Sequence, residues 1–150
     1  NARCFAHDAM LEEERARARR DLFVELGRVR GATFEAVVRI EDEGDEALPA
    51  LVALEDGELV GFAEVARRSD YVNGCDTSPV AFLEAIYVTP DCRRRGCAGA
   101  LVAAVEAWAR DQGLTELGSD ALLENLTSHQ MHEALGFEET ERVVYFRKEL

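Results

Sequence analysis

Cysteine, proline and long apolar runs are all scarce in this sequence. Its 150 residues include three prolines and four cysteines (Cys4, Cys75, Cys92 and Cys97), with no C-x-x-C pair. Free thiols are therefore expected, not a disulfide framework or a thiolate metal site. No apolar stretch approaches the roughly 18 residues that a membrane-spanning helix needs. Residues 1–10 also lack a signal-peptide profile, so we expect a cytoplasmic protein without a membrane partner.

Positive charge is also in short supply. The chain has 17 Lys and Arg against 30 Asp and Glu, a formal net charge of −13. Such a field repels nucleic acid and attracts cations, so nucleic acid is not an expected partner. Acidity that only maintains solubility and acidity that attracts a cationic substrate both remain open. The length suits one globular domain over residues 1–150.

The first third of the chain gives the weakest structural pattern. We expect a short strand at residues 2–5, a helix capped by Asp8 and a second helix at residues 32–42. Acidic residues early in the first helix and arginines later in it suit the helix dipole. Its expected inner stripe consists of Leu11, Ala18, Leu22 and Leu26.

A hairpin and a central strand are predicted next. Residues 50–55 and 59–66 flank Asp56-Gly57, a strong two-residue turn signal, and should pair as antiparallel strands. Residues 80–88 (VAFLEAIYV) form a nearly unbroken apolar run, typical of a strand covered on both faces.

Helices and strands are expected to alternate in the second half of the chain. Together with the hairpin they predict an α/β or α+β layer fold around one mixed sheet. A capping box of Thr127 and Gln130 favours a helix start at that point. The expected elements are a helix at residues 98–112 that Gly113 ends, a strand at 114–119, a helix from Thr127 that Gly136 closes, and a strand at 140–148.

The segment RRRGCAG, residues 93–99, carries the clearest chemical signal. Its small residues let backbone N–H groups approach a phosphate, while the arginines and the following helix N-terminus supply positive potential. It is not a Walker loop, because no Lys-Ser/Thr pair follows the glycines, and it lacks the spacing of a dinucleotide fingerprint. The pattern predicts a phosphate-binding loop, with a solvated basic turn as the alternative.

Two carboxylates stand out by their positions. Glu84 lies within the apolar run at 80–88, where burial would raise its pKa towards that of a useful base. A structural ion pair is the alternative. Asp120 follows a predicted strand end, where ligand crevices form in such folds, although position alone favours a turn or capping role.

Cysteine nucleophile and metal hypotheses are weaker. Cys97 has no base nearby in sequence to activate it. His129 and His132 stand three apart on the expected helix, but no third ligand has a suitable spacing. No metal is therefore expected.

The motif Arg93-x-x-Gly96-x-Ala98 after an apolar strand resembles the pyrophosphate-binding loop of the GNAT acetyltransferase superfamily, and Asn125 with ALGF at 134–137 resembles its later part. The resemblance implies a GNAT-like mixed central sheet flanked by helices, with acetyl-CoA as co-substrate and no metal. The residues that it implies for acetyl-CoA binding are Ile86, Tyr87, Val88, Arg93, Arg94, Arg95, Gly96, Cys97, Ala98, Gly99, Asn125 and His132.

Three longer blocks resemble the aminoglycoside 6′-N-acetyltransferases within that superfamily. They are DYVNGCDTSPVAFLEAIYV, ELGSDALLEN and HEALGFEETERVVYF, which together span over half of the chain from Asp70 onward. The resemblance implies direct acetyl transfer in a ternary complex, with Glu84 and Asp120 as the catalytic carboxylates. The implied substrate-binding residues are Phe23, where the family has a tryptophan, and Tyr71, Glu84, Asp120 and Glu141.

The resemblance also implies a homodimer that involves the C-terminal strand. The general acid stays open between His132, Tyr145 and water, because many superfamily members have a tyrosine where this chain has His132. An acetyltransferase acting on polyamines or protein amines and a non-catalytic coenzyme A sensor remain the alternatives.

Overall fold

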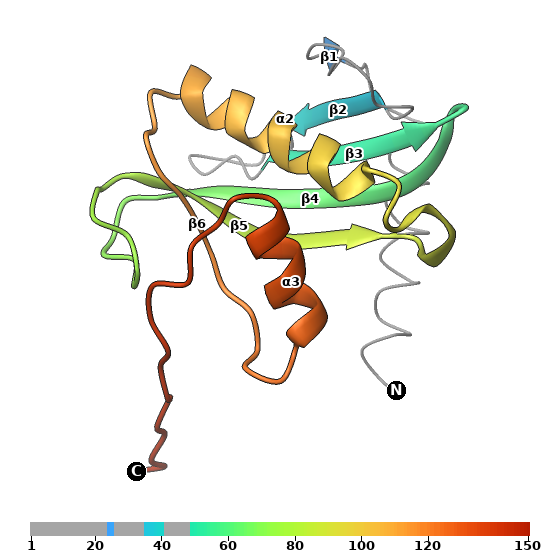
Figure 1. Cartoon of the computed structure of the whole chain (residues 1–150). Helices are drawn as coiled ribbons and strands as arrows, with labels where there is room; N and C mark the ends of the chain where they lie inside the picture. The colour runs from blue at the N-terminus through green and yellow to red at the C-terminus, as the bar shows by residue number, and fades with distance from the viewer. Residues whose placement is uncertain (1–23, 26–34, 41–48) are drawn as a thin grey trace.

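One twisted sheet forms the centre of the structure (Figure 1). The computed structural model describes residues 24–25, 35–40 and 49–150. The strands are β1 (Val24–Glu25), β2 (Glu35–Ile40), β3 (Pro49–Glu55), β4 (Glu58–Arg68), β5 (Val80–Val88) and β6 (Leu117–Ser119). Within the described ranges they form a six-stranded sheet in sequence order, antiparallel except for the parallel pair β5 and β6.

The hairpin and the central strand are confirmed. Asp56 and Gly57 connect β3 to β4 with φ angles of 51° and 80°, both positive as a two-residue turn of this kind requires. Strand β5 has the predicted bounds and lies between β4 and β6. Its first four residues are buried, but Glu84 is exposed, so the expected cover on both faces is wrong for the second half of the strand.

The predicted helix at residues 32–42 is wrong, because this stretch contains strand β2. β2 pairs antiparallel with β3 from Glu35 opposite Leu54 to Ile40 opposite Pro49. A short apolar run with several β-branched residues is compatible with both the helical and the strand periodicity, and the pairing with β3 selects the strand. The end of the first predicted helix is also wrong, since residues 24–25 form β1; the rest of that helix and the strand at 2–5 lie outside the described residues.

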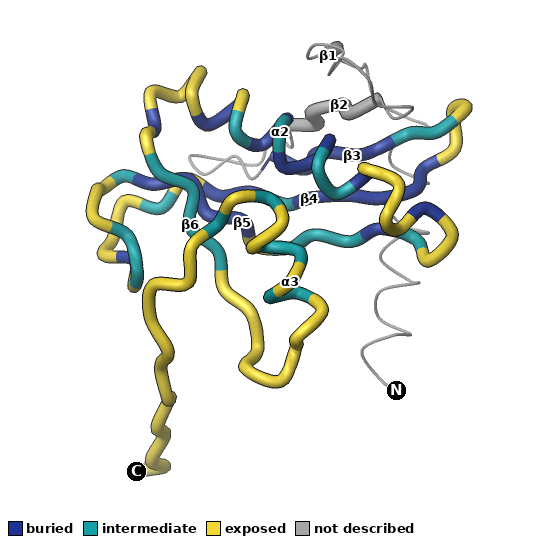
Figure 2. The backbone as a smooth tube through the Cα atoms, in the orientation of Figure 1, coloured by how far each residue is buried: buried dark blue, intermediate teal, exposed yellow. Residues whose placement is uncertain are grey.

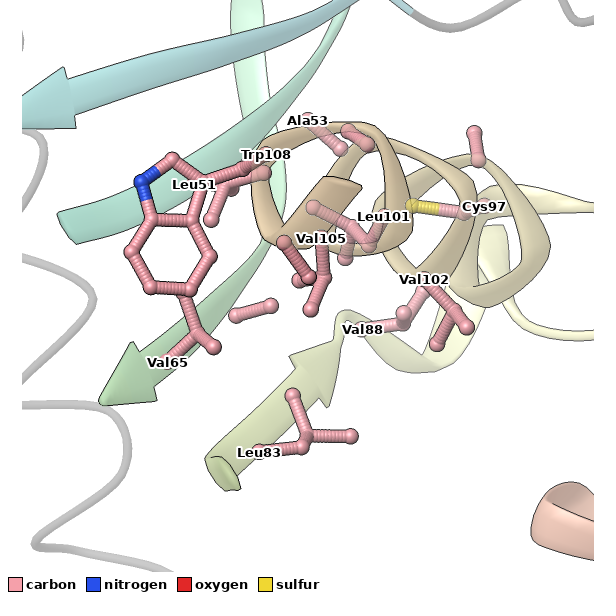
Figure 3. Close-up of a cluster of buried hydrophobic side chains, with 14 of the residues drawn as sticks. Leu51, Ala53, Val65, Leu83, Val88, Cys97, Leu101, Val102, Val105 and Trp108 are labelled. Carbon is pink, nitrogen blue, oxygen red and sulfur yellow. The ribbon is translucent and has the colours of Figure 1, made fainter. Parts of the chain in front are cut away.

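Helix α2 (Cys97–Asp111) lies across one face of the sheet (Figure 1), within one residue of its predicted bounds. Gly113 follows it with φ 71°, as a helix stop requires. Figure 3 shows Leu101, Val105 and Trp108 of the helix directed towards core residues of the strands. Leu101 and Val105 have no exposed surface, so this face supplies the main hydrophobic core.

Helix α3 (Leu126–Ala134) follows β6, and neither helix of the described part is long and apolar enough to cross a bilayer. The predicted capping box is wrong: the cap is Asn125, whose side chain accepts a hydrogen bond from the Ser128 N–H at 3.2 Å. Gly136 closes the helix with φ 88°, as predicted. Leu135 and Phe137 then pack against the core beneath α2.

The strand predicted at residues 140–148 is absent; the chain there is extended and exposed (Figures 1 and 2). Val144, Tyr145 and Phe146 are 77%, 82% and 92% exposed. The residues suit a strand, but a strand also needs a neighbour for its backbone N–H and C=O groups. Among the described residues no strand pairs with this segment.

Gly61 allows the start of α2 to sit close to the sheet. A Cβ atom at this position of β4 would lie 2.7 Å from the Tyr87 carbonyl oxygen and 3.3 Å from Cys97 Sγ. The distance of 2.7 Å is shorter than the contacts that real Cβ atoms make. The Tyr87 oxygen belongs to the backbone, so it cannot relieve the clash by a change of rotamer.

Gly61→Ala should therefore destabilise the protein by about 1–3 kcal/mol, because β4, β5 or α2 must shift to admit the methyl group. Urea unfolding measures the change. Gly99→Ala is the matched control. Gly99 lies in α2, and a Cβ atom there would lie 3.6 Å from Leu135 Cδ2, an ordinary van der Waals distance. A stability of Gly61→Ala equal to that of the control would contradict this account of the packing.

Candidate active site

The sheet opens between β5 and β6. Their parallel pairing runs from Ala81 opposite Leu117 to Leu83 opposite Ser119 and ends there, while β5 continues beside β4 to Val88. Glu84 and Asp120 directly follow the last pair. The two predicted carboxylates therefore follow the last paired residues of these neighbouring segments, where the β5–β6 pairing ends.

A β-bulge places Glu84 on the sheet surface. Glu64 of β4 faces Ala85 and the next residue, Val65, faces Leu83, so Glu84 is the additional residue of the bulge. Glu84 is exposed, and the burial suggested by its apolar surroundings in sequence is wrong. Its carboxylate instead forms an ion pair with Arg68, at 2.9 and 2.7 Å, which is the structural alternative left open by the sequence.

His132 connects α3 to the point where the strands separate. Its Nδ1 donates to the Ser128 carbonyl oxygen at 2.8 Å, and its Nε2 lies 2.9 Å from Ser119 Oγ. Ser119 Oγ in turn donates to the Leu83 carbonyl oxygen at 3.3 Å. These contacts fix the position of the imidazole ring and direct its Nε2 towards the end of β6.

The loop of residues 69–79 carries Tyr71, which is 78% exposed. The backbone N–H groups of Asp76 and Thr77 donate to the Glu116 carboxylate at 3.0 and 2.5 Å, and the Thr77 hydroxyl donates as well. These bonds, that of the Thr77 hydroxyl first, hold the pKa of Glu116 below its ordinary value of 4.5. The stabilisation of the loop by the ionised Glu116 carboxylate is therefore fully present above about pH 4.5, the ordinary pKa, and is lost as the pH falls through the lowered pKa.

The same loop approaches the segment that carries Glu141. A side chain at Gly74 would overlap the Thr140 side chain, so the two backbones lie close together there. Glu141 is exposed next to this contact. The structure thereby brings the loop of Tyr71 and the segment of Glu141 to one region, whereas Phe23 lies outside the described residues.

The three arginines before α2 have different surroundings. Arg93 Nε donates to the Val88 carbonyl oxygen at 2.9 Å, and its guanidinium carbon lies 5.6 Å from the centre of the Tyr87 ring. Arg95 forms an ion pair with Glu55 at 2.6 Å. Arg94 is exposed, with a φ of 58°, and among the described residues it has no ion-pair partner.

The start of α2 fits an anionic group. Its N-cap is Gly96, with φ 93°, which supplies no side chain to cap the first turn. The N–H groups of the first turn have no partner within a helix, and together with the helix dipole they attract an anion. The uncapped turn and the Arg94 guanidinium form the candidate site for the diphosphate of coenzyme A.

Cys97, the first residue of α2, is 1% exposed, and burial foremost raises the pKa of its thiol to about 11. It therefore stays protonated at neutral pH, which excludes the nucleophile hypothesis. Cys75 and Cys92 are also free thiols, as predicted, and Cys4 lies outside the described residues.

The histidine pair is not arranged for a metal. His129 Nε2 contacts the Leu122 carbonyl oxygen at 3.0 Å, while His132 contacts Ser119 and Ser128. In the part of the chain that the structure describes, no three His, Cys, Asp or Glu side chains are grouped to hold a metal ion.

Sequence reasoning missed Arg68 and Ser119. Arg68 lies two residues beyond the strand predicted at residues 59–66, and Ser119 directly precedes Asp120. Only the register of β4, β5 and β6 brings them to Glu84 and Leu83, and no local pattern encodes that register.

The comparisons with known proteins define the class: the chain belongs to the acetyltransferase (GNAT) family, whose model matches residues 10–137. Its relatives include aminoglycoside N(6′)-acetyltransferase type 1 of Salmonella typhimurium, 50% identical over 111 residues, 71% of this chain and 77% of that protein. The Serratia marcescens protein of the same name is 59% identical over 95 residues, 63% of this chain and 65% of that protein.

A solved structure of AAC(6′)-Iy in complex with the bisubstrate analogue CoA-S-monomethyl-acetylneamine is also similar. Its TM-score is 0.67 and its sequence identity 50%, with 71% of this chain and 72% of that chain covered. The resemblance to the GNAT superfamily and to its aminoglycoside-acetylating members is confirmed, as is the GNAT-like mixed sheet flanked by helices.

Arg94→Ala should raise the KM for acetyl-CoA about threefold to thirtyfold, since a charge-assisted contact to phosphate is lost. The KM for the amine substrate should stay unchanged. Steady-state kinetics with each substrate varied separately gives both values. Arg110→Ala is the control, because Arg110 pairs with Glu106 on the exposed side of α2. An unaltered cofactor KM in Arg94→Ala would reject the phosphate site.

Proposed function

We propose that this chain transfers an acetyl group from acetyl-CoA to the 6′-amino group of aminoglycosides. The observation that carries the proposal is the placement of Glu84 and Asp120 at the opening between β5 and β6. The relatives support it, since two are named aminoglycoside N(6′)-acetyltransferases and a third was solved with an analogue that joins coenzyme A to acetylneamine.

The carboxylates have two tasks in this reaction. An aminoglycoside amine is mostly protonated at neutral pH, and an ammonium group is no nucleophile, so the site must remove a proton. Glu84 or Asp120 accepts it directly or through water. The remaining carboxylates, including Glu141, bind the other ammonium groups of the substrate and orient it.

The open edge of β5 and the start of α2 have the complementary tasks. Acetyl-CoA, when bound, supplies an acyl group activated as a thioester. Because β6 ends at Ser119, the backbone of Ile86, Tyr87 and Val88 lacks a strand neighbour on that side among the described residues. An N–H group there can bind the carbonyl oxygen as negative charge develops on it.

We favour His132 over Tyr145 as the general acid. The Ser119 contact orients Nε2 of His132 at the point where β5 and β6 separate. Tyr145 lies in the exposed C-terminal segment and is 82% exposed to solvent. Direct transfer in a ternary complex, one domain over residues 1–150 and a cytoplasmic location stay predictions.

A thiol-release assay with acetyl-CoA tests the proposal. Neamine should be acetylated, and its analogue with a hydroxyl group at the 6′ position should not, because the accepting amine is gone. Spermidine and a peptide with a free N-terminus represent the competing acetyltransferase functions. Turnover of either of these but not of neamine would reassign the substrate, and coenzyme A binding without any turnover would indicate a sensor.

Asp120→Asn and Glu84→Gln should each lower kcat/KM for neamine by about 10²-fold or more, because a proton acceptor and a cation ligand are lost together. Glu106→Gln, which neutralises a carboxylate on the exposed side of α2, is the control and should keep normal turnover. Retention of full activity by both site variants would refute the assigned roles.

We also propose a homodimer in which the C-terminal segment pairs with a second copy. Val143, Val144, Tyr145 and Phe146 are 48% to 92% exposed in one contiguous stretch. Exposed apolar surface of this kind marks an interaction site, and a second chain would supply the missing strand neighbour.

Light scattering should therefore give about twice the chain mass of 16.6 kDa at micromolar concentration. Val144→Asp should shift the mass to the monomer, because a charge would be buried in the interface. Leu122→Asp changes an exposed leucine of another loop and should leave the mass unchanged. A monomeric wild-type protein would exclude this assembly.

A further inference from the structure

Arg68 holds both carboxylate oxygens of Glu84. Its Nε donates to Oε1 at 2.9 Å and its Nη2 to Oε2 at 2.7 Å, a fork-to-fork geometry that only arginine provides. Arg68 is the last residue of β4 and pairs in register with Val80, so its side chain reaches along β5 to the bulge. The two side chains are 40% and 32% exposed.

Phe82 fixes the orientation of this guanidinium. The central carbon of the Arg68 guanidinium lies 3.6 Å from the centre of the Phe82 ring, within the range of a cation–π contact. Phe82 is 4% exposed and therefore held by its surroundings. A surface arginine usually samples many rotamers, but this one is constrained at its plane and at its donors.

The pair changes what a substrate meets at the opening of the sheet. Glu84 is neutralised by an internal cation, whereas Asp120 has no ion-pair partner among the residues that the structure describes. An incoming ammonium group is free to bind Asp120 but must share or displace a guanidinium at Glu84. One of the two carboxylates is thus occupied before the substrate arrives.

We infer that Arg68 is a specificity-determining residue: it is the internal counter-ion of Glu84 and acts on the substrate through that carboxylate. The inference rests on the proposed function. Arg68 occupies the cation position at Glu84 and weakens the binding of every amine there. A substrate with several ammonium groups contacts Asp120 while another of its ammonium groups competes with Arg68 at Glu84, whereas a monoamine makes only one of these contacts, so the pair favours polycations over simple amines.

Calorimetry with neamine and its 6′-hydroxyl analogue tests the inference at about 0.1 M ionic strength, where distant charges are largely screened. Arg68→Met keeps a long apolar side chain and removes the charge together with its contact on the Phe82 ring. Neamine should bind about threefold to tenfold more tightly to this variant, as expected for release of a partly exposed ion pair. The KM for acetyl-CoA should stay unchanged.

Arg67→Met is the matched control. Arg67 is the neighbouring residue of β4, is exposed and forms no described ion pair, so its removal changes the net charge equally without touching Glu84. Its neamine affinity should stay within about twofold of wild type. Equal or weaker neamine binding in Arg68→Met than in Arg67→Met would overturn the inference.

Two further variants keep the test independent of any folding defect in Arg68→Met, which thermal unfolding would reveal. Arg68→Lys keeps the charge but cannot hold both oxygens, so its neamine affinity should fall between those of wild type and Arg68→Met; an affinity below wild type would contradict the inference. In a Glu84→Gln background, Arg68→Met should bring no gain, because the paired charge is already gone; a gain of the same size would overturn the role through Glu84.

The failure of the proposed function has a different signature. Absence of neamine binding and turnover in the wild type would remove the proposed function, and this inference with it. Normal neamine turnover in the wild type combined with equal affinities of Arg68→Met and Arg67→Met would remove only the role of Arg68.

Discussion

The early end of β6 is the constraint on which the site depends. This strand contains three residues, so its parallel pairing with β5 stops at Leu83 and Ser119 while β5 continues. Two consequences follow at that point: β5 has no further pairing with β6, and the next residues of the two segments are Glu84 and Asp120. The bulge opposite Glu64 then turns Glu84 to the surface, and the contact of His132 with Ser119 holds α3 beside the opening. A longer β6 would close the edge with ordinary ladder hydrogen bonds and leave no place for a ligand.

The core under α2 determines where the uncapped first turn of this helix lies. The helix buries Leu101 and Val105 against the sheet, and Gly61 lets its first residue, Cys97, approach β4 closely. Burial of this apolar face provides most of the free energy that holds the helix in place. The same packing brings the uncapped first turn next to the end of β5. Stability and cofactor position therefore depend on one set of contacts, which limits how far either can change alone.

Local patterns in the sequence predicted the elements that carry their own signals. The Asp56-Gly57 turn, strand β5 and helix α2 were found within one or two residues, because turn chemistry and apolar periodicity act over short distances. Residues 32–42 were misassigned, since the choice of strand over helix is made by pairing with β3. The sequence alone singled out the RRRGCAG segment and both carboxylates, but the contacts of Arg68 with Glu84 and of Ser119 with Leu83 arise only through the register of the strands. The segment predicted as a C-terminal strand has the residues of a strand, but among the described residues no strand pairs with it.

The acidity of the chain and the arrangement of the site answer different questions about selectivity. A net charge of −13 attracts any cation and raises encounter rates, but it falls off over about 10 Å at moderate ionic strength and recognises no particular amine. Discrimination requires short-range contacts whose strength differs between ligands. At the opening of the sheet one carboxylate has an internal guanidinium while the other has no described ion-pair partner, so the number of ammonium groups on the ligand matters more than the presence of one. The acidic surface brings amines to the site, and the uneven pairing of Glu84 and Asp120 selects among them.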